Sequence, residues 1–328
     1  MKRFARIMGT GHFAPAKVMA NNEFSEILGQ DIEEFVGGNL NIHERRIMNA
    51  DESPATLAFE AGKRALEMAN IKPEAIDLLI IATDTPEFIS PATASKVQHL
   101  LGAKNAGAFD VNCACAAFVT GVDVAAKYIS IDDQYSNILV IGTYGMSRFL
   151  DFHDIYTATI FADGAGAALV QVSNEPGFLG SRLYADGSYF DYMGIYAGGA
   201  QVPITPELIK AGKHQVRFVK RFPEDTNLAN WPKLIRTVLG KIDRVEADID
   251  FIIFTQININ TIREMMEELK LPWEKTHTIM DHYGYTGAAC IPMALDEAVH
   301  NNQIKRNDLV FLVGSGGGYA MGALAFNW

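Results

Sequence analysis

Short runs of consecutive apolar residues predict strands that are buried on both faces of a sheet. Residues 76–81 read Ile-Asp-Leu-Leu-Ile-Ile, and residues 249–254 read Ile-Asp-Phe-Ile-Ile-Phe. Continuous apolar runs of this length are typical of strands that helices cover on both sides. A helix-like stretch follows each run, at residues 91–101 and 261–269. The chain therefore contains two similar βα segments.

Other elements recur in the same order in the two parts of the chain. Further strands are predicted at residues 137–142 and 308–313, and glycine-rich strand segments follow at 163–170 and 316–326. Such a repeat indicates a duplicated α/β architecture with an active site between the halves. We place the halves at residues 1–172 and 173–328 and assign residues 176–235 to an irregular insertion in the second half.

An apolar helix is predicted at residues 116–130. Its alanines allow close packing and its valines add bulk, so the helix should lie at the centre of the protein. Cys115 directly precedes it, where free backbone N–H groups and the helix dipole favour a thiolate. Cys115 is therefore the candidate nucleophile, whereas Cys113 and Cys290 are interpreted as packing residues.

Composition restricts the possible partners. The 328 residues include 28 Lys+Arg and 39 Asp+Glu, a formal charge of −11, which argues against nucleic acid as a partner. No apolar run approaches the roughly 18 residues of a membrane span. Three cysteines suit a reducing compartment, so we expect a cytoplasmic protein. The histidines show no metal-ligand spacing, and no metal is predicted.

Several motifs, in order along the whole chain, carry a resemblance to a known family. They are Gly9-Thr10-Gly11, Glu44-Arg45-Arg46-Ile47, Phe109-Asp110-Val111 with Cys115, Phe161-Ala162-Asp163-Gly164-Ala165-Gly166-Ala167, Asp281 with Gly284 and Thr286, and Gly316-Gly317-Gly318-Tyr319. With these motifs the chain resembles the β-ketoacyl-ACP synthase III family of the thiolase superfamily. The resemblance implies a dimeric, five-layered αβαβα fold and a role in fatty acid synthesis or secondary metabolism.

The resemblance also implies the chemistry of the site. Cys115 would take an acyl group from an acyl-CoA or acyl-carrier-protein thioester, and no cofactor would be bound permanently. The oxyanion donors would be the backbone N–H groups of Cys115 and Gly317. The expected partners are coenzyme A, an acyl carrier protein and a second copy of the chain.

Two positions depart from the family pattern. Thr255 stands where the family has a histidine, and Tyr285 stands where it has an asparagine. In the family, this pair stabilises the enolate that forms when malonyl-ACP loses carbon dioxide. Threonine has no group that transfers a proton near pH 7, and the tyrosine phenol can donate only one hydrogen bond. Weak decarboxylation is therefore predicted.

The positions that correspond to the coenzyme A site differ as well. Phe35 and Ile155 replace the family's Trp and Arg that enclose the adenine, and Asn258 is assigned to the same site. Asn260 and the pair Glu267-Glu268 replace basic residues of the carrier-binding region. The choice between coenzyme A and a carrier protein as donor stays open.

Three functions remain possible from the sequence. The first is an acyltransferase that passes the acyl group from Cys115 to an amine, an alcohol or an activated carbanion. The second is an ordinary decarboxylating 3-oxoacyl-ACP synthase III in which His153, His282 or Glu87 replaces the missing histidine. The third is a non-catalytic or supporting subunit of a synthase heterodimer, which retention of Cys115 and of the glycine segment disfavours.

Overall fold

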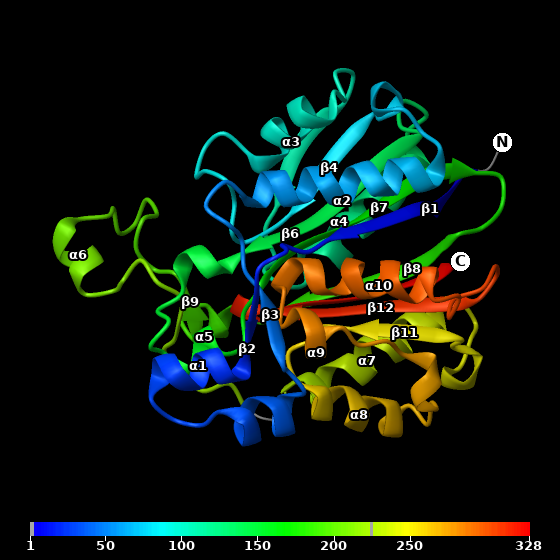
Figure 1. Ribbon diagram of the computed structural model, residues 1–328. Coiled ribbons are helices and arrows are strands. Elements are labelled where there is room, and N and C mark those ends of the chain that lie inside the picture. The colour runs from blue at the N-terminus through cyan, green and yellow to red at the C-terminus, as the bar shows by residue number, and fades with distance from the viewer. Residues whose placement is uncertain (1–2, 224–225) are drawn as a thin grey trace.

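The computed structural model describes residues 3–223 and 226–328, whose two larger sheets form the centre of a layered α/β fold (Figure 1). The first sheet has the strand order β1 (Phe4–Phe13), β7 (Asp163–Ser173), β6 (Asn137–Gly145), β4 (Leu78–Ala82) and β5 (Gly107–Val111). The second has the order β11 (Phe251–Phe254), β12 (Leu309–Gly316), β13 (Ala320–Asn327) and β8 (Phe178–Ala185). In the first sheet β6, β4 and β5 are parallel, and β7 pairs antiparallel with both β6 and β1. In the second sheet β11 and β12 are parallel, and β13 pairs antiparallel with both β12 and β8.

Helices fill three further layers. Figure 1 shows α2 (Pro54–Ala69) and α3 (Thr93–Leu101) on the outer side of the first sheet. Between the sheets lie α4 (Ala117–Ile131) and α10 (Cys290–His300). The outer side of the second sheet is covered by α7 (Thr226–Lys241) and α8 (Ile259–Glu268). These five layers are the αβαβα arrangement that the family resemblance implies.

The strand β4 shows why the apolar runs form central strands. Leu78, Ile80 and Ala82 pack into the core between the two sheets, whereas Leu79 and Ile81 pack beneath α2 and α3. Because alternate side chains of a strand point to opposite faces, a strand with cores on both sides needs apolar residues throughout.

The predicted central helix is α4. A Cβ atom at Gly121 would lie 3.0 Å from Val140 on β6, so the small residue lets the helix lie close against the sheet. Residues 114–131 are long and apolar enough to cross a membrane, but 67% of this stretch is buried inside the protein. It is a core helix of a layered protein.

One prediction was partly wrong. The segment 176–235 is not irregular throughout, because Phe178–Ala185 forms β8 and pairs with β13 along its length. The sequence pattern did not indicate this strand, because its residues are half-buried or exposed and include glycine, serine and arginine. The end of the segment belongs to α7, which covers the outer face of the second sheet.

The remaining described elements are short and lie mostly at one side of the sheets. They are β2 (Val18–Ala20), α1 (Asn21–Leu28), a π-helix (Glu33–Gly38), β3 (Glu44–Arg46), α5 (Ile155–Ala158), β9 (Met193–Gly194), α6 (Pro206–Lys210), β10 (Arg217–Phe218), α9 (Met280–Tyr283) and several single 3₁₀ turns.

Candidate active site

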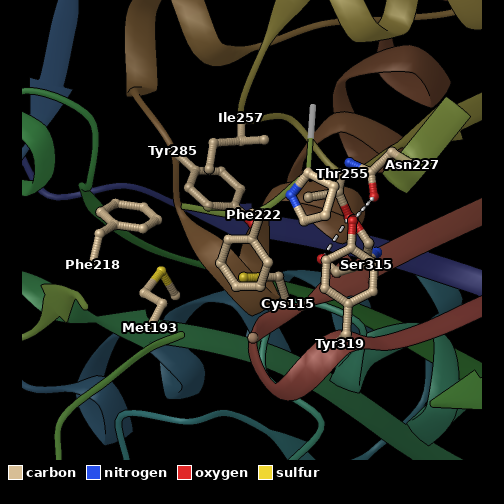
Figure 2. Close-up of a pocket in the computed structure, with 13 residues that line it drawn as sticks. Cys115, Met193, Phe218, Phe222, Asn227, Thr255, Ile257, Tyr285, Ser315 and Tyr319 are labelled. Carbon is tan, nitrogen blue, oxygen red and sulfur yellow. Dashed lines mark hydrogen bonds between the residues drawn. The ribbon is translucent and has the colours of Figure 1, made fainter. Parts of the chain in front are cut away.

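The candidate site lies where parallel strands of both sheets end. Cys115 follows β5, Thr255 follows β11, and Gly317 follows β12. Because parallel strands bring their carboxyl ends to one edge, such edges are common ligand sites in α/β folds. Figure 2 shows the side chains of Cys115, Thr255 and Tyr285 around one cleft, which Gly317 also lines. The structure thus brings together the four residues predicted to be catalytic.

A tight turn positions Cys115. Ala114 adopts a left-handed conformation with φ of 46°, which is uncommon for a residue with a side chain. The Ala114 N–H donates to the Asn112 carboxamide oxygen at 3.1 Å, and the Ala116 N–H donates to the Cys113 carbonyl at 3.1 Å. These bonds hold Cys115 at the entrance to α4, where it is 2% exposed.

The glycine segment approaches the backbone of Cys115 directly. A methyl group at Gly316 would lie 2.5 Å from the Cys115 nitrogen and 2.8 Å from the Cys113 carbonyl oxygen. Gly318 has a φ of 71°, in the region that favours glycine. Only a residue without a side chain permits this contact, so the glycine at 316 sets the distance between the nucleophile and the Gly317 loop.

Tyr285 contacts the candidate nucleophile. Its hydroxyl group is hydrogen-bonded to the Cys115 thiol, and its ring centroid lies 5.6 Å from that of Phe161. The Tyr285 N–H donates to the Ile160 carbonyl, and the Ala162 N–H donates to the Tyr285 carbonyl, both at 3.0 Å. Tyr285 is therefore fixed by backbone and ring contacts with its phenol directed at the sulfur.

Thr255 has a different set of partners. Its hydroxyl oxygen accepts a hydrogen bond from the Ser315 N–H at 2.9 Å and donates to the Ser315 carbonyl at 3.3 Å. The side chain is 2% exposed. Because the hydroxyl hydrogen is engaged by the chain itself, Thr255 joins the ends of β11 and β12 and offers no free proton to a substrate.

The electrostatics of Cys115 differ from the sequence-based expectation. Burial raises the pKa of the thiol well above its usual range, and the Asp84 carboxylate raises it further. The hydrogen bond from Tyr285 acts in the opposite direction and lowers it. A backbone hydrogen bond at Cys115 also lowers the pKa, in the direction expected at a helix start, but desolvation of the charged sulfur outweighs it.

Asp84 is a functional candidate that sequence reasoning missed. It follows β4, and its Oδ1 atom is buried without a hydrogen-bond partner among the described residues. Burial raises the pKa of this carboxyl to about 6. The available signal was an acidic residue directly after a buried strand, in the Thr83-Asp84-Thr85 segment.

Aromatic and apolar residues of the segment before α7 form the outer wall of the cleft. Met193, Phe218 and Phe222 line it, together with Tyr319. The Tyr319 hydroxyl donates to the Asn227 carboxamide oxygen at 3.2 Å, as Figure 2 shows. This wall suits an apolar acyl chain, and its residues have no motif that marks them in the sequence.

The three residues predicted to contact the coenzyme do not line this cleft. Phe35 lies on the π-helix Glu33–Gly38 and is 39% exposed, and Ile155 begins α5. Asn258 caps α8, because its side-chain oxygen accepts the Asn260 N–H at 2.9 Å. The structure explains Asn258 by this cap.

The three candidate replacements for the missing histidine also lie elsewhere. Glu87 is paired with Lys96 and accepts the Ala55 N–H at 3.1 Å. Hydrogen bonds from His282 to Asp281 and Glu297 raise the pKa of the imidazole to about 9, so it carries a proton at pH 7. His153 is exposed and does not line the cleft.

The other two cysteines pack near the site. Cys113 is half-buried, and Cys290 is buried at the start of α10, where desolvation raises the pKa of its thiol to about 12. All three cysteines are reduced. Within residues 3–223 and 226–328, no three His, Cys, Asp or Glu side chains are grouped as a metal site would require.

Comparison with known proteins gives matches along the whole chain. The family description 3-oxoacyl-acyl-carrier-protein (ACP) synthase III matches residues 109–187, and the description of its C-terminal part matches residues 240–328. The chain is 36% identical over 336 residues to the beta-ketoacyl-acyl-carrier-protein synthase III of Clostridioides difficile, covering 100% of this chain and 99% of that protein.

Solved structures give the same result. The 3-oxoacyl-acyl-carrier-protein synthase III from Aquifex aeolicus matches with a TM-score of 0.88 and 33% identity, covering 99% of this chain and 100% of that one. The priming beta-ketosynthase of a polyketide biosynthetic pathway matches with a TM-score of 0.90 and 25% identity, covering 99% and 96%. The likeness confirms the predicted thiolase-like fold.

Proposed function

The chain belongs to the 3-oxoacyl-ACP synthase III family of condensing enzymes and is an acyltransferase of that type; on this basis, we propose that it loads an acyl group onto Cys115 and passes it to an acceptor that needs little activation. The donor is an acyl-CoA or acyl-ACP thioester, the substrates that the family uses. An amine, an alcohol or an activated carbanion would serve as acceptor.

One observation carries the proposal: Cys115 lies in the cleft with the Tyr285 hydroxyl on its sulfur and the Gly316 backbone against its nitrogen. In the attack, the thiol becomes a thioester and the carbonyl oxygen gains negative charge. Backbone N–H groups of Cys115 and Gly317 would meet that charge, because fixed dipoles stabilise an oxyanion more than mobile water does.

The same geometry supports weak decarboxylation. Loss of carbon dioxide from a malonyl thioester leaves an enolate whose oxygen needs hydrogen-bond donors. Thr255 gives its hydroxyl hydrogen to Ser315, and Tyr285 gives its own to Cys115. Removing one fixed donor of this kind typically costs on the order of 100- to 1000-fold in rate.

The first experiment identifies the acylated residue. We expect intact-mass spectrometry after incubation with a panel of acyl-CoA thioesters to show one acyl adduct, which peptide mapping places on Cys115. Cys115→Ala should lose the adduct and Cys113→Ala should keep it. An adduct on Cys113, or one that persists in Cys115→Ala, contradicts the proposal.

The second experiment separates the proposal from an ordinary decarboxylating synthase, which the 36% identity to the Clostridioides difficile protein favours. Carbon dioxide release from malonyl thioesters should be far slower than acyl loading, and the double change Thr255→His with Tyr285→Asn should raise it. Release by the unmodified enzyme at a rate comparable with loading would establish the ordinary reaction instead.

We also propose that the enzyme is a cytoplasmic homodimer of chains with the halves 1–172 and 173–328. Family resemblance supports the dimer. Light scattering at micromolar concentration should give twice the mass of one chain; the mass of a single chain contradicts this expectation.

A further inference from the structure

The register of three strands places Asp84 at the same edge of the first sheet as the turn that carries the nucleophile. Ala82 on β4 is opposite Val111 on β5 and Gly142 on β6. Two residues farther along, the same parallel strands lead to Asp84, to Cys113 in the loop of the nucleophile, and to Tyr144. The central position of β4 thus places Asp84 between the Cys115 turn and β6.

Hydrogen bonds hold the Asp84 segment in this place. The Thr83 N–H donates to the Val111 carbonyl at 3.1 Å, and the Gly145 N–H donates to the Thr85 hydroxyl oxygen at 2.9 Å. Thr83 and Thr85 are themselves buried and bonded to each other. Hydrogen bonds therefore hold both chain neighbours of Asp84 in place. The Asp84 carboxylate oxygen Oδ1 has no hydrogen-bond partner among the described residues.

Among the described residues, the groups whose pKa Asp84 affects are a thiol and a phenol. The charge on Asp84 acts on Cys115 and on Tyr144, whose hydroxyl is also buried without a described partner. Beyond them lie Tyr285 and Cys290 from the second half and Asp163 from β7. In the Asp84 segment itself, Glu87 is paired with Lys96.

The Asp84 residue is half-buried, but its Oδ1 atom is buried without a described partner, and an unpartnered buried carboxylate oxygen is costly for a fold. Such groups concentrate at functional sites, where a titration near neutral pH serves proton transfer. Burial raises the pKa of Asp84 to about 6, whereas burial raises the pKa of the Cys115 thiol, on which the Asp84 charge acts, well above its usual range. Cys115 needs a base, and no imidazole of the described residues lines its cleft.

We propose that Asp84 is the base that accepts the Cys115 proton during acyl loading. This inference rests on the proposed function. As the Cys115 S–H bond breaks, its proton passes to the Asp84 carboxylate and the sulfur bonds to the thioester carbonyl carbon. When the tetrahedral intermediate collapses, the bond from carbon to the donor sulfur breaks, and the departing thiolate takes the proton from Asp84. Acyl-CoA and the enzyme thiol thus become acyl-enzyme and free coenzyme A.

Two rates measured on the whole enzyme from pH 5 to 8 test this role. One is the first-turnover release of coenzyme A from acyl-CoA thioesters. The other is alkylation of Cys115 by iodoacetamide, which needs no thioester. In the unmodified enzyme both rates should fall below about pH 6, where Asp84 becomes protonated.

Variants at both ends of β4 separate the role of Asp84 from a structural effect. Asp84→Asn should slow loading on the order of 100-fold at pH 7 and remove the inflection near pH 6. Asp84→Glu should retain an inflection. The matched control is Asp77→Asn at the opposite end of β4, where the carboxylate accepts the backbone N–H groups of Ser136 and Asn137; its pH profile should equal that of the unmodified enzyme.

The outcomes distinguish this inference from the proposed function. Asp84 is not the base if Asp84→Asn loads Cys115 at an unchanged rate, or if iodoacetamide alkylates Cys115 faster in this variant because a repelling charge has gone. In either case the proposed function stands. If no thioester loads Cys115 but alkylation keeps its inflection and its dependence on Asp84, the proposed function fails and the base assignment stands. An unmodified enzyme with no inflection in either rate overturns the inference without any variant.

Discussion

Replacing Asp84 by asparagine should stabilise the fold at neutral pH. The pKa of Asp84 rises from 3.8 to about 6 on folding because burial disfavours the charged form. The difference of about 2 units corresponds to about 3 kcal/mol of unfolding free energy that the ionised carboxylate costs at pH 7. An asparagine has nearly the same shape and carries no charge, so the variant avoids this cost.

The sign of the pH dependence follows from proton binding. Between pH 3.8 and about 6 the folded protein keeps the Asp84 proton while the unfolded chain has lost it, so the free energy of unfolding falls as pH rises. The stability advantage of Asp84→Asn should therefore be smallest at low pH, reach about half its full size by pH 5, and level off above pH 7. The burial of the Asp84 Oδ1 atom without a hydrogen-bond partner also destabilises the folded protein, so it too predicts that Asp84→Asn is stabilising.

Urea unfolding at one protein concentration, repeated from pH 4.5 to 8, measures this difference. The control Asp77→Asn replaces a charged acceptor of two backbone N–H groups by a neutral one, which weakens both hydrogen bonds, and should be less stable than the unmodified protein at pH 7. A stability difference for Asp84→Asn that does not grow between pH 4.5 and 7, or a destabilised variant at pH 7, would refute the burial argument.

Three further changes test other contacts. Gly316→Ala should abolish acyl loading of Cys115, measured by intact mass, because the added methyl group would lie 2.5 Å from the Cys115 nitrogen; normal loading contradicts the close approach. Thr255→Val should lower the free energy of unfolding by about 1 kcal/mol through the lost bonds to Ser315, yet leave loading intact; a large loss of loading with unchanged stability would assign Thr255 to the chemistry instead. The pKa of His282 rises to about 9 through its carboxylate partners, so its stabilising effect is complete below about pH 6.5 and is lost as pH rises through 9. Thermal unfolding should show that the stability loss caused by His282→Gln becomes smaller over that pH range. A stability loss that stays constant with pH rules out the ion pairs of His282 as its cause.

The sequence by itself determined the elements that local chemistry controls. Continuous apolar runs gave β4 and β11 because a strand between two cores has no polar face. The small residues of α4 predicted a central helix, and the position of Cys115 directly before that helix marked it as the candidate nucleophile. These properties depend on side-chain size and periodicity, which are written directly in the chain.

Tertiary structure decided what depends on neighbours far apart in sequence. The strand β8 exists because β13 supplies its hydrogen-bond partners, although its own pattern is mixed. Thr255 is engaged by Ser315 only because β11 and β12 end side by side. The pKa values of Cys115 and Asp84 depend on how deeply the layers bury them and on their mutual distance. A sequence states which groups can ionise, whereas the free energy of ionisation is determined by the solvent and charges that the fold leaves around each group.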